Sequence, residues 1–358
     1  MVVLGSTGSI GTNALLLARK FNLEIEALSC NKNVDLLNLQ ILEFKPKFVA
    51  IADESLAKDV KHDKVFVGEN GILEMLKECK SQKVINSLVG FAGLKPSVLT
   101  QKLGKKLCLA NKESLVVAGK FLDTKNIKAI DSEHFGLKFL LKDSPKISKM
   151  IITASGGAFR DAKLSELKNA TPKDALKHPN WDMGAKITID SATMTNKLFE
   201  IMEAYHLYGV TNLDAFIERT STVHALIEFI DGSTTTHISK PDMKLAIASA
   251  VMDEIKEPIL EPFDLLSLEN GLKFERIDLE KYPIFKLKDD VIKNPDLGVI
   301  INASNEVYIS KFLKNECGYL DNQKIVFESL DKFAGFKANS LDEIFEIDKK
   351  VREFANQI

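Results

Sequence analysis

A glycine-rich turn near the N-terminus constrains the fold more than any other feature of the chain. Residues 1–4 form an apolar run, residues 5–11 read GSTGSIG, and a helical pattern follows to about residue 19. Strand, glycine turn and helix together begin a dinucleotide-binding fold, because glycines let the backbone approach a pyrophosphate and the helix N-terminus attracts its charge. The spacing is G-x-x-G-x-x-G instead of the usual G-x-G-x-x-G, so a tight turn in another α/β domain remains an alternative.

The residues after the second predicted strand bear on which dinucleotide would bind. This strand, residues 24–28, leads into Ser-Cys-Asn31-Lys32-Asn33. An NAD site is expected to place Asp or Glu here for the ribose hydroxyls, whereas Lys32 offers a cation for a 2′-phosphate. We therefore predict NADP over NAD, with a solvated loop lysine as the alternative.

Strands and amphipathic helices then alternate in a way typical of a doubly wound parallel sheet. We predict strands at 48–51, 65–67, 84–86 and 107–109, with helices between them, for example at 54–60 and 72–79. The last of these strands ends in Ala-Asn111-Lys112-Glu113-Ser, and ligands bind at such strand ends in open α/β sheets. These side chains therefore either face a ligand or cap the next helix.

Two carboxylates follow the strand predicted at 127–130, in the sequence Asp131-Ser132-Glu133-His134. At i, i+2 past a strand they can point to the same side and make an oxygen-only site suited to Mg²⁺ or Mn²⁺. The alternative is a capped helix start, with Asp or Ser as the cap. Glu200 is available as a third carboxylate.

A further strand at 149–153 precedes Ala154-Ser155-Gly-Gly, which is a small anion cradle or only a turn. Residues 178–184, HPNWDMG, contain Pro and Gly breakers and the only Trp of the chain, so we predict a loop. A large apolar side chain on a loop suggests that Trp181 closes over something.

A helix is predicted after a short β-like run at 187–189, and its polar face concentrates several functional groups. Ser191 is expected near the helix start, where free N–H groups favour an anion. Asn196, Lys197 and Glu200 fall on the side opposite the apolar face. The alternative is an ordinary amphipathic helix with a solvated Lys–Glu pair.

Composition excludes several classes of protein. The length of 358 residues indicates two or three domains, and the net charge of −2 gives no reason to expect binding to nucleic acid or membrane. No apolar run is long enough to span a bilayer, and we read the N-terminus as a strand instead of a signal peptide. The four cysteines are far apart, which argues against zinc and disulfides and fits a cytoplasmic protein.

The C-terminal half suggests a hairpin at 222–239, a linker at 258–283, and helices at 299–313, 322–333 and 340–355. The expected fold class is α/β, with a Rossmann-like doubly wound sheet, a catalytic α/β domain with a mixed sheet, and a small C-terminal helical domain. The expected boundaries are 1–131 for the dinucleotide domain, 132–255 for the catalytic domain, 256–284 for the linker and 285–358 for the helical domain.

Six segments in order resemble the 1-deoxy-D-xylulose 5-phosphate reductoisomerase family, the NADP-dependent enzymes of the non-mevalonate (MEP) isoprenoid pathway. They are GSTGSIG, ANKES, DSEH, ASGGAFR, HPNWDMG, and DSATMTNK with its following Glu200, and the hairpin extends the match to about residue 233. The resemblance implies conversion of 1-deoxy-D-xylulose 5-phosphate to 2-C-methyl-D-erythritol 4-phosphate, using NADPH and Mg²⁺ or Mn²⁺. It also implies a homodimer.

The resemblance assigns roles residue by residue. The metal falls to Asp131, Glu133 and Glu200. The substrate phosphate falls to Ser155, His178, Ser191, Asn196 and Lys197, while Ser132 and Lys112 match residues that touch the hydroxyl-bearing carbons. Trp181 would cover the substrate. The cofactor contacts are Thr7, Gly8, Ser9, Ile10, Asn31, Lys32, Asn33, Asn111, Glu113 and Gly184.

The chain departs from the family pattern at three positions, and two other functions remain as alternatives. Ala154 stands where members often have Gly, Asp182 places a negative charge on the loop, and Asn31 replaces a frequent Gly or Ala. One alternative is another NADP-dependent dehydrogenase of similar plan, of the semialdehyde or homoserine type, which would use a Cys or a Lys–Asp pair. The other is a non-catalytic NADP sensor, which would need neither three carboxylates nor a Trp lid.

Overall fold

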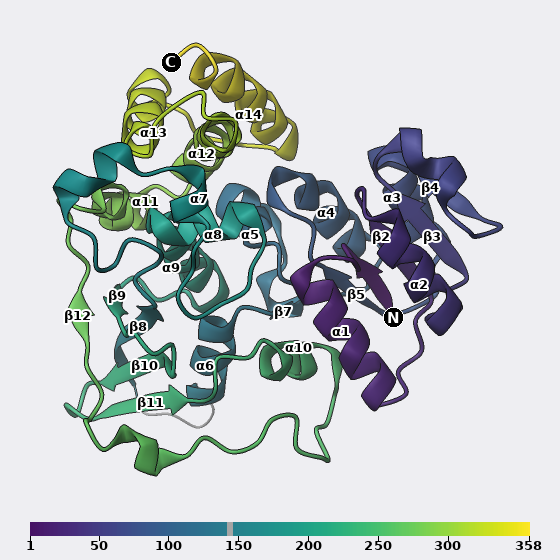
Figure 1. Ribbon diagram of the computed structural model, residues 1–358, viewed down its shortest axis with the longest axis horizontal. Helices are drawn as coiled ribbons and strands as arrows, with labels where there is room; N and C mark the ends of the chain where they lie inside the picture. The colour runs from purple at the N-terminus through teal and green to yellow at the C-terminus, as the bar shows by residue number, and fades with distance from the viewer. Residues whose placement is uncertain (142–145) are drawn as a thin grey trace. The chain divides into compact units, whose positions relative to one another are not determined.

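The N-terminal residues fold as their pattern predicts. In the computed structural model, which describes residues 1–141 and 146–358, β1 (Val2–Leu4) leads through the glycine turn into α1 (Ser9–Lys20) (Figure 1). The chain divides into two units. Unit 1 comprises Met1–Ser114, Leu122–Phe135 and Asp242–Glu261, and unit 2 comprises Leu115–Phe121, Gly136–Pro241 and Pro262–Ile358.

Unit 1 is built on a seven-stranded sheet in the order β4-β3-β2-β1-β5-β6-β7, in which every neighbouring pair is parallel. This confirms the predicted doubly wound sheet. The strand order reverses between β1 and β5, which is where such sheets bind ligands. The other strands are β2 (Ala27–Cys30), β3 (Phe48–Ile51), β4 (Val65–Val67), β5 (Lys83–Asn86), β6 (Lys106–Leu109) and β7 (Ile127–Ala129). The helices are α2 (Val34–Phe44), α3 (Gly68–Glu78), α4 (Leu94–Lys102) and α10 (Lys244–Val251), while α5 (Lys112–Ala118) and α6 (Ser132–Leu140) begin in unit 1 and end in unit 2.

Apolar side chains on both faces of this sheet form the core of unit 1. Val3 and Leu28 are fully buried on one face, where Ile247 of α10 joins them from a much later part of the chain. Leu4 packs on the other face with Met75 of α3. Because both faces are covered, the strands read as nearly continuous apolar runs instead of alternating ones.

Unit 2 contains a five-stranded mixed sheet in the order β11-β10-β8-β9-β12, in which only β8 and β9 are parallel neighbours. The predicted hairpin is confirmed, because β10 and β11 pair in antiparallel register on either side of Asp231 and Gly232. The strands are β8 (Ile147–Ala154), β9 (Leu213–Ile217), β10 (Val223–Phe229), β11 (Thr234–Ile238) and β12 (Glu275–Arg276). The helices are α7 (Pro172–Ala175), α8 (Ala185–Ala192), α9 (Thr195–Tyr208), α11 (Lys288–Lys293), α12 (Leu297–Leu313), α13 (Asp321–Lys332) and α14 (Leu341–Ala355).

The C-terminal helices α12, α13 and α14 confirm the three helices predicted there, and Figure 1 shows them grouped together. Tyr308 and Phe312 of α12, and Tyr319 between α12 and α13, pack in one cluster with Phe159, which lies just beyond β8. None of the helices in the described ranges combines the length and the hydrophobicity that crossing a lipid bilayer requires.

Three local predictions were wrong or displaced. The run 187–189 is helical and lies inside α8, because Thr188 and Ile189 are buried and Lys186 pairs with Asp190 one turn later. The strand predicted at 24–28 is β2, which starts at Ala27, and the helix predicted at 54–60 is a 3₁₀ segment (Glu54–Asp59). Tertiary packing overrides the β-branched preference of Ile-Thr-Ile for strands.

Candidate active site

The glycine turn of unit 1 has the features of a phosphate cradle. A Cβ on Gly11 would lie 2.3 Å from the Gly5 carbonyl oxygen, so this glycine is needed for α1 to pack against the turn. Gly8 differs, because its φ is −82° and the nearest described atom to an added Cβ is 3.4 Å away. The fold therefore does not require glycine at position 8, whereas a ligand approaching the backbone would. No side chain in the described residues caps the N-terminus of α1, which suits an anion.

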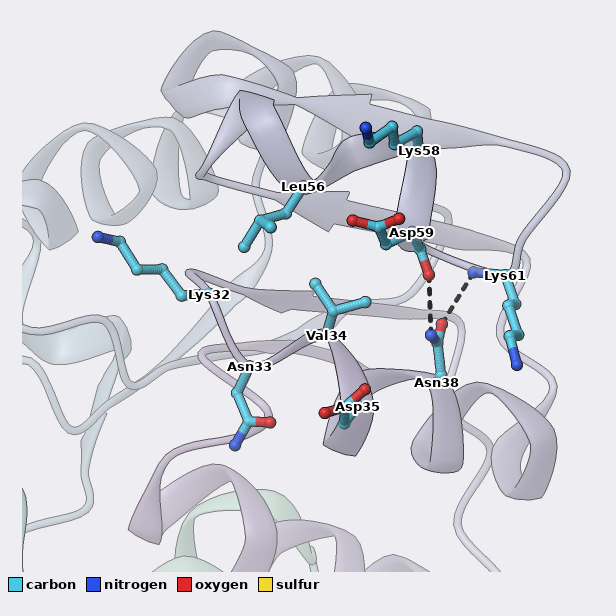
Figure 2. Close-up of a pocket in the computed structure, with 9 residues that line it drawn as sticks. All are labelled: Lys32, Asn33, Val34, Asp35, Asn38, Leu56, Lys58, Asp59 and Lys61. Carbon is cyan, nitrogen blue, oxygen red and sulfur yellow. Dashed lines mark hydrogen bonds between the residues drawn. The ribbon is translucent and has the colours of Figure 1, made fainter.

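The loop after β2 places Lys32 in solvent beside a hollow of about 650 Å³ (Figure 2). The Lys32 side chain is 72% exposed, and its ammonium lies 3.9 Å from Asp53. Asn33 caps α2, with its Oδ1 atom accepting from the Leu36 N–H. Figure 2 shows Lys32 extending away from Lys61 on the far side of the hollow. A cation that is exposed and only loosely paired is available to a phosphate ligand.

Asn111, at the carboxyl end of β6, has a structural role. Its Nδ2 atom donates to the Leu88 and Gly90 carbonyls at 2.8 Å each, and its Oδ1 atom accepts from the Ser114 N–H. The helix-capping interpretation therefore describes the Asn111 side chain. Glu113, which accepts from Asn111 at 3.1 Å, is held in the same network.

Unit 1 supplies two of the three predicted metal-ligand carboxylates, and both follow β7. Lys112 lies 2.6 Å from the Asp131 Oδ2 atom, and the Ser132 hydroxyl donates to Glu133 at 2.6 Å. Burial disfavours the Asp131 carboxylate, but the Lys112 ammonium and a hydrogen bond with Glu133 outweigh it, so the pKa of Asp131 lies well below its ordinary value. Asp131 is therefore ionised, as a ligand for a hard cation must be.

Unit 2 supplies the third carboxylate from α9, together with two of the predicted phosphate contacts. The Asn196 amide donates to the Glu200 Oε1 atom at 2.5 Å, and Lys197 pairs with the Glu200 Oε2 atom. Lys197 and Glu200 are 4% and 1% exposed, so the solvated-pair interpretation is wrong. The buried Asn196 Oδ1 atom has no hydrogen-bond partner among the described residues, and such atoms usually have a ligand or water.

Ser191 lies in the last turn of α8, not at the start of the next helix as predicted. The two helices are separate because Met194 adopts a left-handed conformation with a φ of 65° between them. A Cβ on Gly157 would lie 2.6 Å from the Ser191 carbonyl oxygen. The Ser-Gly-Gly turn after β8 therefore packs directly against the end of α8, which places Ser155 and Ser191 in the same region of unit 2.

His178 joins this region through its ring. Its Nε2 atom lies 2.9 Å from the Ser155 hydroxyl, while its Nδ1 atom accepts from the Trp181 N–H at 2.9 Å and the Asn180 N–H at 3.2 Å. Because backbone N–H groups can only donate, Nδ1 is the acceptor and the proton of the neutral ring is on Nε2. Burial, followed by the charges of Arg160 and Lys197, lowers the pKa of His178 to about 4. The neutral ring can therefore donate from Nε2 to an anion.

The loop that carries His178 is anchored to the segment before β10. Asn180 donates to the Ser221 hydroxyl at 2.7 Å, and the Trp181 indole donates to the same oxygen at 3.3 Å. Ser221 has a φ of 56°, which is uncommon for a residue other than glycine. Sequence reasoning missed Ser221 because it lies 40 residues from Trp181.

Arg160 is another functional residue that sequence reasoning did not assign. Its guanidinium donates to the Ser155 and Arg219 carbonyls at 3.1 and 2.8 Å, and its charge acts on His178. It ends the ASGGAFR motif, so the motif itself held the signal. Arg160 and Lys197 both act on His178 through their charges, although Lys197 pairs with Glu200 and Arg160 lies 3.5 Å from Asp161. Cations beside hydroxyls and a neutral imidazole are groups that can bind a phosphate monoester.

The cysteines are poorly suited to act as nucleophiles. Burial raises the pKa of Cys30 to about 11 and the pKa of Cys79 and Cys108 to about 12. Burial also raises the pKa of Cys317 to about 11. Since the thiolate is the reactive form, these values argue against a dehydrogenase that uses a catalytic Cys.

Comparison with known proteins shows one family along the whole chain. Residues 1–119 match the model for 1-deoxy-D-xylulose 5-phosphate reductoisomerase, residues 127–208 match its C-terminal domain model, and residues 238–354 match a DXP reductoisomerase C-terminal domain. The chain is 63% identical to the 1-deoxy-D-xylulose 5-phosphate reductoisomerase of Campylobacter hominis over 355 residues, covering 99% of this chain and 98% of that protein. It is 54% identical to the enzyme of Campylobacter jejuni strain RM1221, covering 99% of both.

Two solved structures resemble the fold closely. A crystal structure of DOX-P reductoisomerase in complex with NADPH, fosmidomycin and magnesium has a TM-score of 0.92 at 34% identity, covering 99% of this chain and 97% of the other. The 1-deoxy-D-xylulose 5-phosphate reductoisomerase from Zymomonas mobilis in complex with NADPH has a TM-score of 0.88 at 32% identity, with the same coverage.

Proposed function

The chain belongs to the 1-deoxy-D-xylulose 5-phosphate reductoisomerase family, and from this premise we propose that it converts 1-deoxy-D-xylulose 5-phosphate to 2-C-methyl-D-erythritol 4-phosphate. The reaction uses NADPH and a divalent metal ion, Mg²⁺ or Mn²⁺, in the non-mevalonate isoprenoid pathway. The observation that carries the proposal is the 63% identity to the reductoisomerase of Campylobacter hominis over 99% of this chain. The phosphate-compatible cluster in unit 2 agrees with it, because the substrate is a phosphate monoester.

We propose that unit 1 holds the NADPH. The pyrophosphate would bind the turn at Thr7, Gly8, Ser9 and Ile10, where the helix N-terminus is open and position 8 leaves room for a ligand. The 2′-phosphate would bind the loop of Asn31, Lys32 and Asn33. Asn111, Glu113 and Gly184 complete the proposed cofactor set, although the Asn111 side chain already caps α5 and would contribute mainly by ordering that strand end.

We propose that the metal ion binds Asp131 and Glu133 of unit 1 and Glu200 of unit 2. Three carboxylates are ligands of the kind that Mg²⁺ and Mn²⁺ prefer. When bound, the ion would polarise the substrate ketone and stabilise the developing alkoxide. Lys112 and Lys197, each paired with one of these carboxylates, balance the negative charge. On this proposal Lys112 and Ser132 also contact the hydroxyl-bearing carbons.

The substrate phosphate is proposed to bind Ser155, His178, Ser191, Asn196 and Lys197. These residues come from the turn after β8, the 178–184 loop, α8 and α9, all within unit 2. A phosphate held here is a remote handle whose binding energy orients the reacting carbons. Trp181, on the same loop as His178, would cover the substrate and exclude water from the aldehyde before hydride transfer.

We further propose a cytoplasmic homodimer with the domain boundaries 131/132, 255/256 and 284/285. The dimer proposal rests on the family and on exposed apolar side chains near β11, at the edge of its sheet. Phe139 and Ile230 are each 67% exposed. Large exposed apolar side chains beside a sheet edge are a common site of association. Sedimentation at micromolar concentration tests this directly, and a monomer there would contradict it.

The main proposal is tested by measuring the rate of NADPH oxidation at a saturating concentration of 1-deoxy-D-xylulose 5-phosphate while the Mg²⁺ concentration is varied. Oxidation that requires both the substrate and the metal ion is expected. Metal-independent oxidation of a semialdehyde would indicate the other type of dehydrogenase. NADPH binding with no oxidation of either substrate would indicate a sensor.

A further inference from the structure

The proposed phosphate site depends on α8, a helix too short to fix its own position. It has eight residues, Ala185–Ala192, which is about two turns. Isolated helices this short are not stable in water, so tertiary contacts must hold α8 in place. Ser191, proposed above as a phosphate contact, lies in its last turn and moves with it.

A buried chain of polar groups connects α8 to the C-terminal helices. The Asn305 amide, on α12, donates to the Asp190 Oδ1 atom at 2.7 Å, and the Asn322 amide, on α13, donates to the Asn305 Oδ1 atom at 2.9 Å. Lys186 pairs with the other Asp190 oxygen at 2.8 Å. Asp190, Asn305 and Asn322 are 2%, 0% and 5% exposed. Water therefore cannot replace a lost partner without rearrangement.

A second contact reaches the end of the same helix. The Tyr319 hydroxyl donates to the Ala192 carbonyl at 2.6 Å, so the residues on both sides of Ser191 are held by side chains from the C-terminal part of the chain. On the opposite side, Gly157 packs against the Ser191 carbonyl. A shift of α8 would thus change the separation between Ser191 and Ser155, which follows β8.

We propose that Asn305 is a positioning residue for the substrate phosphate, acting through Asp190 to fix α8. The C-terminal helices, which contain no recognised catalytic motif, then set the affinity of the phosphate site. This inference rests on the proposed function, because it takes the Ser155, His178 and Ser191 region as the phosphate site. It does not require Asn305 to touch the substrate.

The experiment measures the binding of inorganic phosphate to the NADPH-saturated protein by calorimetry, so that the cofactor's own phosphate positions are filled. Asn305→Ala is expected to raise the phosphate Kd by about tenfold, which corresponds to about 1.4 kcal/mol. The Kd for NADPH should stay within about twofold, since every proposed cofactor contact except Gly184 lies in unit 1, and Gly184 lies at the opposite end of α8 from Asp190. The matched control is Glu306→Gln, because Glu306 is the next residue on α12 and pairs with Arg352 of α14.

A swap of the two groups provides a restoring variant. Asn305→Asp alone places two carboxylates together and should weaken phosphate binding at least as much as Asn305→Ala. Adding Asp190→Asn restores a donor–acceptor pair and should recover at least part of the affinity. If Asn305→Ala does not fold, Asn322→Ala can be measured in its place. It removes only the hydrogen bond between Asn322 and Asn305, and is expected to weaken phosphate binding by a smaller factor.

The outcomes separate the two proposals. If the wild-type NADPH complex binds no phosphate, the proposed site is wrong and this inference fails with it. If the wild-type protein binds phosphate and Asn305→Ala binds it equally well, only the positioning role is refuted. A lower melting temperature without a change in the phosphate Kd would likewise show that Asn305 contributes to stability alone.

Discussion

His178 offers the sharpest test of the site, because its two ring nitrogens have separate tasks. Nδ1 accepts hydrogen bonds from two backbone N–H groups and so shapes the 178–184 loop. Nε2–H faces Ser155 and can donate to the proposed substrate phosphate. Asn and Gln side chains can each reproduce one of these two functions of the His178 ring. His178→Asn keeps an acceptor close to the Nδ1 position, and His178→Gln keeps a donor close to the Nε2 position.

The two variants should lose different quantities. A net contribution of about 0.5–1.5 kcal/mol for each hydrogen bond to Nδ1 gives roughly 1–3 kcal/mol of loop anchoring, which His178→Gln removes. A hydrogen bond to a charged phosphate contributes about 1.5–3 kcal/mol, which His178→Asn removes, raising the substrate Kd by roughly 10- to 150-fold. The Asn variant should therefore bind substrate weakly with an ordered loop, and the Gln variant should have a loosened loop.

Calorimetry with 1-deoxy-D-xylulose 5-phosphate in the absence of NADPH measures the loss of substrate affinity in His178→Asn. Hydrogen exchange across residues 178–184 measures the loosening of the loop in His178→Gln. Equal substrate affinity in His178→Asn and wild type would refute the phosphate contact. Unchanged exchange in His178→Gln would refute the anchoring role of Nδ1.

The same residue predicts a pH dependence. Its pKa is lowered from an ordinary value of 6.5 to about 4 in the folded protein, so the unfolded chain binds the extra proton first as pH falls. The stabilisation from neutral His178 is therefore complete above pH 6.5 and is lost progressively between pH 6.5 and 4. Loop exchange, corrected for the intrinsic rate, should accelerate in that window in wild type and much less in His178→Asn.

The remaining predictions concern the metal, the cofactor and the loop. Asp131→Asn and Glu200→Gln should each abolish turnover while the NADPH Kd is kept, and a near-normal rate at saturating Mg²⁺ would reject that ligand. Lys32→Ala should reduce the preference for NADPH over NADH in binding titrations. Lys61→Ala, on the far side of the hollow, should leave that preference unchanged. An equal reduction in both variants would contradict the assignment of Lys32 to the 2′-phosphate site. Adding a phosphonate hydroxamate substrate mimic with Mg²⁺ and NADPH should change Trp181 emission, and Trp181→Ala should lower kcat as well as raise KM. An unchanged emission would identify Trp181 as part of a static wall.

Local patterns in the sequence were sufficient for much of this protein. The glycine turn and the alternation of apolar strands with amphipathic helices predicted the parallel sheet of unit 1, because short crossover connections leave few topologies open. The hairpin and the three C-terminal helices followed from turn residues and periodicity alone. The candidate site residues came from ordered motifs, which carry both the residue types and their spacing.

The tertiary structure decided what depends on neighbours distant in the chain. Residues 187–189 are β-branched and locally favour a strand, yet they lie in α8 because burial and the Asp190–Asn305 contact, 115 residues apart in sequence, outweigh that preference. Periodicity placed Lys197 and Glu200 on a polar face, but not in the interior, because a polar face becomes buried only when other segments cover it. The anchoring of Trp181 by Ser221 has the same origin. The sequence determined which functional side chains are present. Long-range packing determined which of them are buried in contact with one another.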